Sequence, residues 1–351
     1  MLKNDLLLRA ARRERTERTP VWLIRQAGRY DPEYQAVRKR CGLALEEMFR
    51  RPDLAATISL LPRRLGVDAI IVFQDILIPL APMGAPFVFR PGPILESPLR
   101  TSGDVRALMG RDPVGELGFV RETLQFVRNA LGDELPLLGF AGAPFTLACF
   151  LIEGGSPGAS PQHVRAMMRA EPALLHGLLE ALADMTADYL AMQIESGADA
   201  VQLFESSADV LSRTEYESFA HRYQARVFSK LAATVPTILF VKDFSDVGLM
   251  AESGADVLSI GAGVDLASAI ERVGDRVALQ GNLDNQLLVN GPIPRIEAAV
   301  RDCVRVGGSR GHILNLGHGL LKETPIEHVR CLIDTCKATR VAASADLVEA
   351  G

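Results

Sequence analysis

Several features that assign chains to common protein classes are missing from this sequence. No apolar run approaches the roughly 18 residues that a membrane-spanning helix needs, so membrane insertion is not expected. The net charge of −5 argues against a general nucleic-acid binder, so an acidic ligand would have to be held by a few placed arginines. No G-x-G-x-x-G pattern follows the first predicted strand, which weakens the case for a dinucleotide-binding sheet.

Cysteines are few and show no spacing typical of a metal site or a disulfide framework. The five cysteines form neither a C-x-x-C nor a His-x-Cys pair, and they are Cys41, Cys149, Cys303, Cys331 and Cys336. An odd number without such pairs indicates neither a disulfide framework nor a zinc site. We therefore expect no bound metal and a cytoplasmic location, where cysteines stay reduced.

The arginine-rich residues 1–20 have a composition that could be mistaken for a transit peptide. They also carry Asp5, Glu14 and Glu17, which such peptides avoid. The apolar spacing within residues 6–11 fits a short amphipathic helix that runs toward Pro20. We predict that this segment is part of the fold.

Composition and strand pattern together predict one α/β domain. The chain has 351 residues, of which 48% are hydrophobic and 23% charged, as in an ordinary globular protein. Its short apolar runs are rich in Val, Ile and Leu without polar alternation, which is typical of parallel strands buried on both faces. The predicted strands are 20–24, 68–73, 135–140, 199–204, 236–241, 256–260, 276–280 and 312–316.

Helical stretches separate these runs, including 115–132 and a long stretch over 161–197 that is broken at Pro172. About eight β/α units favour a (β/α)₈ TIM barrel, a single domain over 1–351, ahead of a doubly wound open sheet. A weak repeat supports this: SGADAVQLFES from Ser196, SGADVLSIGAG from Ser253 and, more loosely, LGVDAIIVFQD from Leu65. Each copy is a helix-to-strand junction in which glycine supplies a left-handed helix cap.

A barrel predicts where the site lies. Active sites of such barrels occupy a cleft at the carboxyl-terminal ends of the strands. The polar residues just past the predicted strands supply cations, one carboxylate and small polar groups, without a metal-ligand cluster or a nucleophile with its base. They are Arg25, Arg29, Asp75, the AGAPFT turn from Ala141, Glu205, Ser206, Lys242, Asn282, Asp284 and His318.

The segment PVWLIRQAGRYDPEY from Pro20 is the most informative of these. Its apolar run stops at Arg25, and Arg29 follows four residues later with Gly28 between them. Two planar guanidiniums around a glycine indicate a carboxylate-binding corner, because each fork holds a pair of anionic oxygens while the glycine lets backbone amides approach. The alternative is a pair of solvated surface arginines.

The chain resembles the uroporphyrinogen decarboxylases in motifs spread in order over almost its whole length. The similar segments are PVWLIRQAGRYDPEY, FQDIL around Asp75, GFAGAPFTLACFLIEGG from Gly139, QLFES ending at Ser206, GNLD from Gly281 and NLGHG around His318. The resemblance implies a cofactor-free, usually homodimeric barrel. It also implies a carboxy-lyase of heme biosynthesis that converts the four acetate arms of uroporphyrinogen III to methyl groups, giving coproporphyrinogen III and carbon dioxide.

The resemblance also implies residue roles. Asp75 would accept hydrogen bonds from pyrrole N–H groups and stabilise the developing cation; its alternative is a helix N-cap. Arg25 and Arg29 would bind carboxylates, with Arg29 the candidate proton donor, although an arginine with a pKa above about 12 is a poor acid. Ser206 and His318 would contact carboxylates; the alternatives are a helix-capping serine and a structural histidine.

Four further residues would contact substrate by the same resemblance: Gln26, Ala27 and Gly28 between the arginines, and Phe150 after the GFAGAP turn. The family commonly has tyrosine where this chain has Phe150, so a phenolic hydroxyl is missing.

Other departures lie nearby. Gln74 stands where a small residue is usual beside Asp75, KDFS from Lys242 replaces a glycine-rich turn, and SIGAG from Ser259 replaces a segment with an Asp-Trp pair.

Two alternatives remain open at this point. One is a corrinoid or thiol methyltransferase of the same superfamily, which would need zinc held by His and Cys. The other is a noncatalytic tetrapyrrole-binding relative, suggested by the altered positions. In each case the expected partner is a small molecule, neither nucleic acid nor membrane, and the sequence leaves the proton donor and the substrate isomer undetermined.

Overall fold

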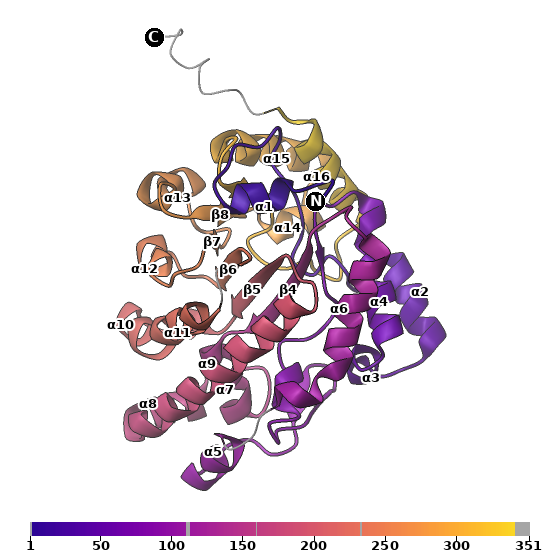
Figure 1. Cartoon of the computed structure of the whole chain (residues 1–351). Helices are drawn as coiled ribbons and strands as arrows, with labels where there is room; N and C mark the ends of the chain where they lie inside the picture. The colour runs from indigo at the N-terminus through magenta and orange to yellow at the C-terminus, as the bar shows by residue number, and fades with distance from the viewer. Residues whose placement is uncertain (1, 110–112, 159, 232–233, 341–351) are drawn as a thin grey trace.

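The computed structural model describes residues 2–109, 113–158, 160–231 and 234–340, in which one parallel sheet is surrounded by helices (Figure 1). The strand order is β1-β4-β5-β6-β7-β8-β9, and every neighbouring pair is parallel. The strands are β1 Ile70–Ile71, β4 Leu137–Gly142, β5 Ala200–Glu205, β6 Thr237–Val241, β7 Val257–Ser259, β8 Ala278–Gln280 and β9 His312–Ile313. Each overlaps a predicted run, so the predicted TIM-barrel-like α/β fold is confirmed.

The first predicted strand, 20–24, is the exception. It forms an isolated parallel bridge between Val21 and Leu314 instead of a ladder. On one side Leu314 N–H donates to Pro20 O at 2.9 Å, and on the other Asp68 N–H donates to Val21 O at 2.7 Å. Residues 20–24 therefore fill the place between β9 and β1 and complete the ring of strands.

The helices occupy the predicted stretches. The stretch 115–132 gives α6 after a short 3₁₀ turn, and 161–197 gives α8 and α9, separated at Pro172 as predicted. The α-helices are α1 Leu6–Ala11, α2 Pro32–Cys41, α3 Leu45–Phe49, α4 Pro52–Leu60, α5 Ser102–Met109, α6 Gly118–Leu131, α7 Pro144–Glu153, α8 Gln162–Ala170, α9 Pro172–Glu195, α10 Arg213–Tyr216, α11 Arg222–Lys230, α12 Val247–Ala251, α13 Leu266–Val273, α14 Asn285–Asn290, α15 Ile293–Gly307 and α16 Ile326–Ala338.

Short elements complete the chain. The 3₁₀ turns are η1 Leu61–Leu65, η2 Ile78–Leu80, η3 Val114–Glu116 and η4 Ala208–Val210, and η5 Glu217–His221 is a π-helical turn. An antiparallel hairpin, β2 Phe87–Phe89 with β3 Pro93–Leu95, was not predicted. Its strands are three residues each within a proline-rich stretch, so neither length nor periodicity marks them in the sequence.

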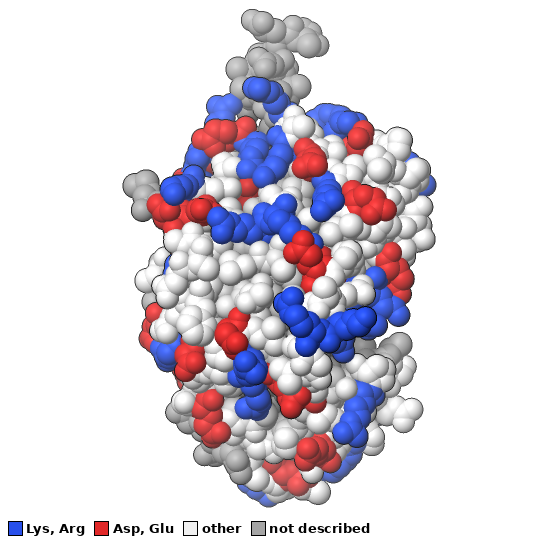
Figure 2. Space-filling view, turned by 90° about the vertical axis from the view of Figure 1, so that its right-hand side faces the viewer, with Lys and Arg blue, Asp and Glu red and all other residues white. Residues whose placement is uncertain are grey.

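The molecular surface carries charges of both signs. Figure 2 shows acidic and basic side chains interspersed over the face where α2 and α4 lie at the right of Figure 1. Among the helices that the structure describes, none is long and apolar enough to cross a membrane.

Polar side chains link several strands inside the barrel. Trp22 Nε1 donates to Gln280 Oε1 at 2.9 Å, and Gln280 Nε2 donates to Gln202 Oε1 at 3.1 Å and to Ser259 Oγ at 2.9 Å. All four residues are fully buried. Since a buried polar group is costly without a partner, these bonds fix the segment 20–24 against β5, β7 and β8.

The sequence repeat corresponds to one structural device. Its glycines all have positive φ, with values of 82° at Gly66, 106° at Gly197 and 85° at Gly254. The aspartate two residues after each glycine forms two hydrogen bonds with one residue of a neighbouring strand segment. Its backbone N–H donates to the carbonyl of that residue, and its carboxylate accepts the N–H of the same residue. The pairs, with these two distances, are Asp68 with Val21 (2.7 and 2.8 Å), Asp199 with Leu137 (2.7 and 2.8 Å) and Asp256 with Thr237 (3.1 and 2.8 Å).

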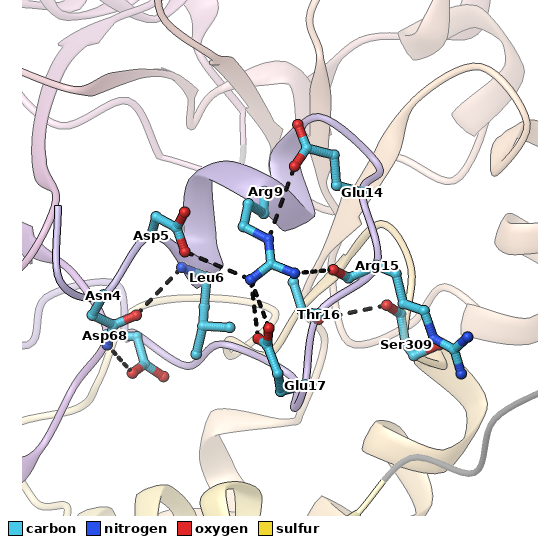
Figure 3. A network of polar contacts seen from close by, with 10 residues as sticks. All are labelled: Asn4, Asp5, Leu6, Arg9, Glu14, Arg15, Thr16, Glu17, Asp68 and Ser309. Carbon is cyan, nitrogen blue, oxygen red and sulfur yellow. Dashed lines mark hydrogen bonds and ion pairs between the residues drawn. The ribbon is translucent and has the colours of Figure 1, made fainter. Parts of the chain in front are cut away.

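Asp68 also anchors the N-terminal segment. Its carboxylate accepts hydrogen bonds from Asn4 Nδ2 at 2.8 Å and from the Arg18 guanidinium at 2.6 Å. Figure 3 shows the neighbouring Arg9, whose guanidinium contacts Glu17 at 2.9 Å and also reaches Asp5, Glu14 and the carbonyl of Arg15. Helix α1 ends at Ala11, earlier than predicted, but the segment is folded onto β8 and β9 as expected.

The three aspartates predict a graded effect on stability. Asp68 is 0% exposed, the Asp199 side chain is 27% exposed and Asp256 is exposed. Replacing Asp68 by Ala leaves Arg18 and a buried N–H without their partner, so we expect a loss of about 3 kcal/mol in unfolding free energy. Asp256→Ala, the matched control, should cost about 1 kcal/mol. Asp199→Ala should fall between these two. Urea denaturation of the three variants measures the order of their unfolding free energies, and equal losses would contradict it.

Candidate active site

The candidate residues follow the carboxyl-terminal ends of different strands. Arg25 follows residues 20–24, which complete the ring of strands. Asp75 lies after β1, Ser206 directly follows β5, and His318 lies after β9. The charge of Arg25 lowers the pKa of both the Asp75 carboxyl and the His318 ring, and the Arg25 side chain lies against Gly319, next to His318. The predicted convergence of these strand ends is therefore seen at Arg25, Asp75 and His318.

Arg25 sits in a tight turn with a left-handed backbone, φ 62°. Such a conformation costs roughly 1–2 kcal/mol for a residue with a side chain, so the surroundings must hold it. Gln26 does this: its N–H donates to Leu23 O at 3.0 Å and its Nε2 donates to Ala69 O at 3.0 Å. Tyr30 O–H donates to Gln26 O at 2.8 Å. The Gln26 amide is thus engaged within the protein, and its predicted contact with substrate stays a prediction.

The glycines on both sides of His318 are explained by close approach. A Cβ added at Gly319 would lie 2.5 Å from Cδ of Arg25, and one at Gly317 would lie 2.1 Å from the backbone N of Ala262. Glycine is therefore needed at Gly317, where the obstacle is backbone, whereas at Gly319 the obstacle is a flexible side chain.

Both arginines of the opening segment are exposed at this end of the barrel. Among the described residues, no carboxylate lies within 4.0 Å of either guanidinium, so both are solvated, as in the alternative of surface arginines, and their binding of substrate carboxylates stays a prediction. Ala27 and Gly28 lie half-buried between them, and Gly28 O accepts the Asp31 N–H at 3.0 Å. Two cations without a carboxylate partner in this part of the structure are suited to anionic ligands.

Asp75 makes one local hydrogen bond, and its role toward a substrate stays a prediction. One carboxylate oxygen accepts the Leu77 N–H at 2.9 Å, and the other oxygen is not used by that bond. The 3₁₀ turn η2 begins at Ile78 and has no side-chain cap, so the helix-cap alternative is not seen. Burial raises the pKa of Asp75 to about 6, against the effects of the Leu77 bond and Arg25. Around neutral pH the group is mostly ionised and poorly solvated, which suits it to stabilise a cation.

Tyr189 lies near Asp75 and was not predicted. Burial, and after it the charge of Asp75, raise the pKa of the Tyr189 phenol. The residue comes from the carboxyl-terminal half of α9, where it occupies one of many apolar positions. No local sequence signal distinguishes it from a core residue, so only the packing of α9 against the barrel brings it to Asp75.

His318 is half-buried and meets Phe240 edge-on, with ring centroids 5.9 Å apart. Burial and then the charges of Arg25 and Lys242 lower the pKa of His318 to about 4. The ring is therefore neutral at pH 7. It can donate a hydrogen bond to a carboxylate but brings no positive charge.

Ser206 is held through its backbone. Its N–H donates to Thr146 Oγ1 at 2.8 Å, and no hydrogen bond of its hydroxyl occurs among residues that the structure describes. Phe150, one turn further along α7 than Thr146, is half-buried and packs against the hydrophobic core. The roles of both residues as substrate contacts stay predictions.

The unusual residues noted in the sequence have defined contacts. Gln74 Nε2 donates to Phe49 O of α3 at 3.2 Å, and Lys242 Nζ pairs with Asp209 at 2.7 Å. Asp243, next to Lys242, has a positive φ of 49°. Within the described ranges, no three His, Cys, Asp or Glu side chains are grouped in a way that could hold a metal ion.

Comparison with known proteins decides the family. Residues 2–339 match the family model described as Uroporphyrinogen decarboxylase (URO-D). The chain belongs to the uroporphyrinogen decarboxylase family. Curated uroporphyrinogen decarboxylases are similar over nearly their full length: that of Picosynechococcus sp. is 44% identical over 95% of this chain and 96% of its own, and that of Myxococcus xanthus is 43% identical over 97% of each. That of Chloroflexus aurantiacus is 41% identical over 98% and 99%.

Solved structures support the same fold. A methyltransferase from Methanosarcina mazei has a TM-score of 0.78 at 22% identity and covers 95% of this chain and 98% of its own. A B12-independent methionine synthase from Shewanella has a TM-score of 0.53 at 11% identity over 85% of this chain and 87% of its own. At these identities the likeness concerns the fold alone, so it does not favour a methyltransferase over a uroporphyrinogen decarboxylase.

The raised pKa of Asp75 predicts how stability depends on pH. The folded carboxyl binds its proton more tightly than the unfolded one, which titrates near 3.8, so its contribution to stability is lost as the pH rises from about 4 through about 6. Asp75→Asn keeps the shape and the Leu77 bond without a charge. We expect the variant to match the wild type at pH 4 and to exceed it at pH 8 by on the order of 2 kcal/mol. Thermal unfolding at both pH values measures this, and a difference that does not change with pH would contradict it.

The two glycines around His318 predict opposite tolerance. An alanine at Gly317 meets the backbone at Ala262, so Gly317→Ala should cost about 1–3 kcal/mol in unfolding free energy. The three atoms nearest to an alanine Cβ at Gly319 all belong to the Arg25 side chain, which can move, so Gly319→Ala should cost less than about 1 kcal/mol. Urea denaturation compares the two variants, and a larger loss for Gly319→Ala would rule out this explanation.

Proposed function

We propose that this protein is a carboxy-lyase of heme biosynthesis that decarboxylates the four acetate arms of uroporphyrinogen III, giving coproporphyrinogen III and carbon dioxide. The observation that carries the proposal is the identity of 41–44% to curated uroporphyrinogen decarboxylases over nearly the whole chain. The grouping of Arg25, Asp75 and His318 at one end of the barrel supports it.

The substrate can serve as its own electron sink. Protonation of a pyrrole carbon beside an acetate arm gives a cationic ring, and the bond to the carboxylate then breaks with its electron pair moving into the ring. A proton added at the methylene carbon and one lost from the ring complete the methyl group. This balance needs no oxidant and no cofactor, and none is proposed. The protein has to place a proton donor and stabilise the ring cation.

The residues present suit those tasks. Asp75, mostly ionised near neutral pH, would accept the pyrrole N–H groups and stabilise the ring cation. Arg25 and Arg29 would bind acetate and propionate carboxylates. We assign proton delivery to the neighbourhood of Arg29, through water or a substrate carboxyl, since a guanidinium with a pKa above about 12 is a weak acid.

Further contacts would surround the ring. Ser206 and a neutral His318 would donate hydrogen bonds to carboxylates, and Phe150 would offer an apolar surface in place of the family's usual phenol. Ala27 and Gly28 would allow the substrate close to the backbone between the arginines. Gln26 would contribute mainly by holding this turn.

We also propose that residues 1–351 form a single domain, that the protein is a homodimer, and that it works in the cytoplasm. The continuous ring of strands supports the first proposal. The dimer rests on the family, and the cytoplasmic location rests on five free cysteines that form no disulfide.

An anaerobic assay with uroporphyrinogen I and III tests the function. We expect the four acetate carboxylates to be lost stepwise, giving coproporphyrinogen and carbon dioxide. Chromatography of the oxidised porphyrins measures each step. Asp75→Asn is the matched control: it keeps the shape but should lose most turnover, by about a hundredfold or more. Tight binding of uroporphyrinogen by the wild type without release of carbon dioxide would identify a noncatalytic relative.

A further inference from the structure

A buried polar cluster below the end of β5 takes no part in the mechanism described above. Its members are fully buried and come from four elements: Thr146 of α7, Glu205 at the end of β5, Tyr216 of α10 and Gln224 of α11. Tyr216 O–H donates to Gln224 Oε1 at 2.7 Å, and Gln224 Nε2 donates to Glu205 Oε2 at 3.3 Å. The other oxygen of Glu205 accepts the hydroxyl of Thr146.

The Thr146 hydroxyl is fully used. Its one hydrogen goes to Glu205, and its oxygen accepts the N–H groups of Ser206 at 2.8 Å and Ser207 at 3.2 Å. A hydroxyl has one donor and two acceptor positions, so all three are occupied. The turn that carries Ser206 is therefore fixed to α7 through a single side chain.

Glu205 accepts the one hydrogen of the Thr146 hydroxyl. The N–H groups of Ser206 and Ser207 can only donate, so the Thr146 oxygen accepts them and its hydrogen has to point to Glu205. Burial raises the pKa of Glu205 to about 7, so keeping a carboxyl here is costly. An apolar residue would cost less, but it would not orient Thr146.

The other side of the turn is held as well. Lys242 N–H donates to Glu205 O at 2.9 Å, and Lys242 Nζ pairs with Asp209 at 2.7 Å. The segment from Glu205 to Asp209 is thus bonded to α7 and to the end of β6. Ser206 is half-buried within it, with its backbone immobilised and its hydroxyl on the turn.

We propose that Thr146, oriented by Glu205, is a positioning residue for substrate: its hydroxyl holds the Ser206–Ser207 turn so that the Ser206 hydroxyl meets a substrate carboxylate. This inference rests on the proposed function, because the ligand of Ser206 is taken to be a carboxylate arm of uroporphyrinogen. Thr146 itself need not touch the substrate.

The test compares Thr146→Val, which removes the hydroxyl at nearly constant shape, with Thr146→Ser, which keeps it. We expect Thr146→Val to raise KM for uroporphyrinogen by about tenfold with a smaller change in kcat, because a misplaced Ser206 loses one hydrogen bond to a charged group. Thr146→Ser should restore KM to within about twofold of the wild type.

A double-mutant cycle separates positioning from general destabilisation. Ser206→Ala should raise KM by a similar factor, and adding Thr146→Val to it should raise KM no further. The control is Thr237→Val, which removes a buried hydroxyl bonded to Asp256 at 2.9 Å at the opposite end of the strands. It should lower the unfolding temperature and leave KM unchanged.

Other results would overturn the inference. The inference is rejected if the wild type releases carbon dioxide and Thr146→Val leaves KM unchanged. It is also rejected if Thr146→Val raises KM by the full factor when Ser206 is already alanine. If Thr146→Val does not fold, Glu205→Leu, which cannot accept the Thr146 hydrogen, takes its place in the same cycle and must raise KM only when Ser206 is present. If the wild type releases no carbon dioxide, the proposed function fails instead. Equilibrium binding of uroporphyrinogen to the same variants then decides the positioning role, and equal affinities reject it.

Discussion

The arrangement of the candidate site depends on how residues 20–24 close the ring of strands. Val21 is paired with Leu314 on one side, and on the other it exchanges two hydrogen bonds with Asp68. The Asp68 carboxylate is 0% exposed, and a buried charge is stable only where its hydrogen bonds are satisfied. Here the Val21 N–H, Asn4 and Arg18 satisfy them. The same N–H and carboxylate exchange recurs at Asp199 and Asp256, which shows a repeated solution to joining strands at their amino-terminal ends.

Closure at one end has consequences at the other. Ile24 N–H donates to Asn315 Oδ1, and Ile24 O accepts the Leu320 N–H. The extended segment therefore ends at Ile24, and the chain turns at the next residue. Arg25 then takes a left-handed backbone, and its side chain lies over Gly319. The strain of that turn is offset by the hydrogen bonds of Gln26. The placement of Arg25 beside Asp75 and His318 follows from these constraints.

Charge and burial are separated within the site. The two arginines are exposed and free of carboxylates among the described residues, whereas burial raises the pKa of Asp75 and lowers that of His318. Anionic groups of a ligand would meet cations near solvent, and its reacting ring would meet an incompletely solvated carboxylate. Such a division suits a substrate that has many carboxylates around an apolar ring, because desolvation strengthens only the interaction with the developing cation.

The sequence by itself determined the order of the parallel strands, the barrel, and the strand-end positions of Arg25, Asp75, Ser206 and His318, because hydrophobic periodicity and strand-end position are local properties. It did not determine that residues 20–24 would form a bridge instead of a ladder, or that Tyr189 would lie near Asp75 and Thr146 would hold the Ser206 turn. Thr146 and Ser206 are 60 residues apart in the chain. Their contact depends on the packing of α7 beside β5, and pairings between distant segments are decided only when the whole barrel closes.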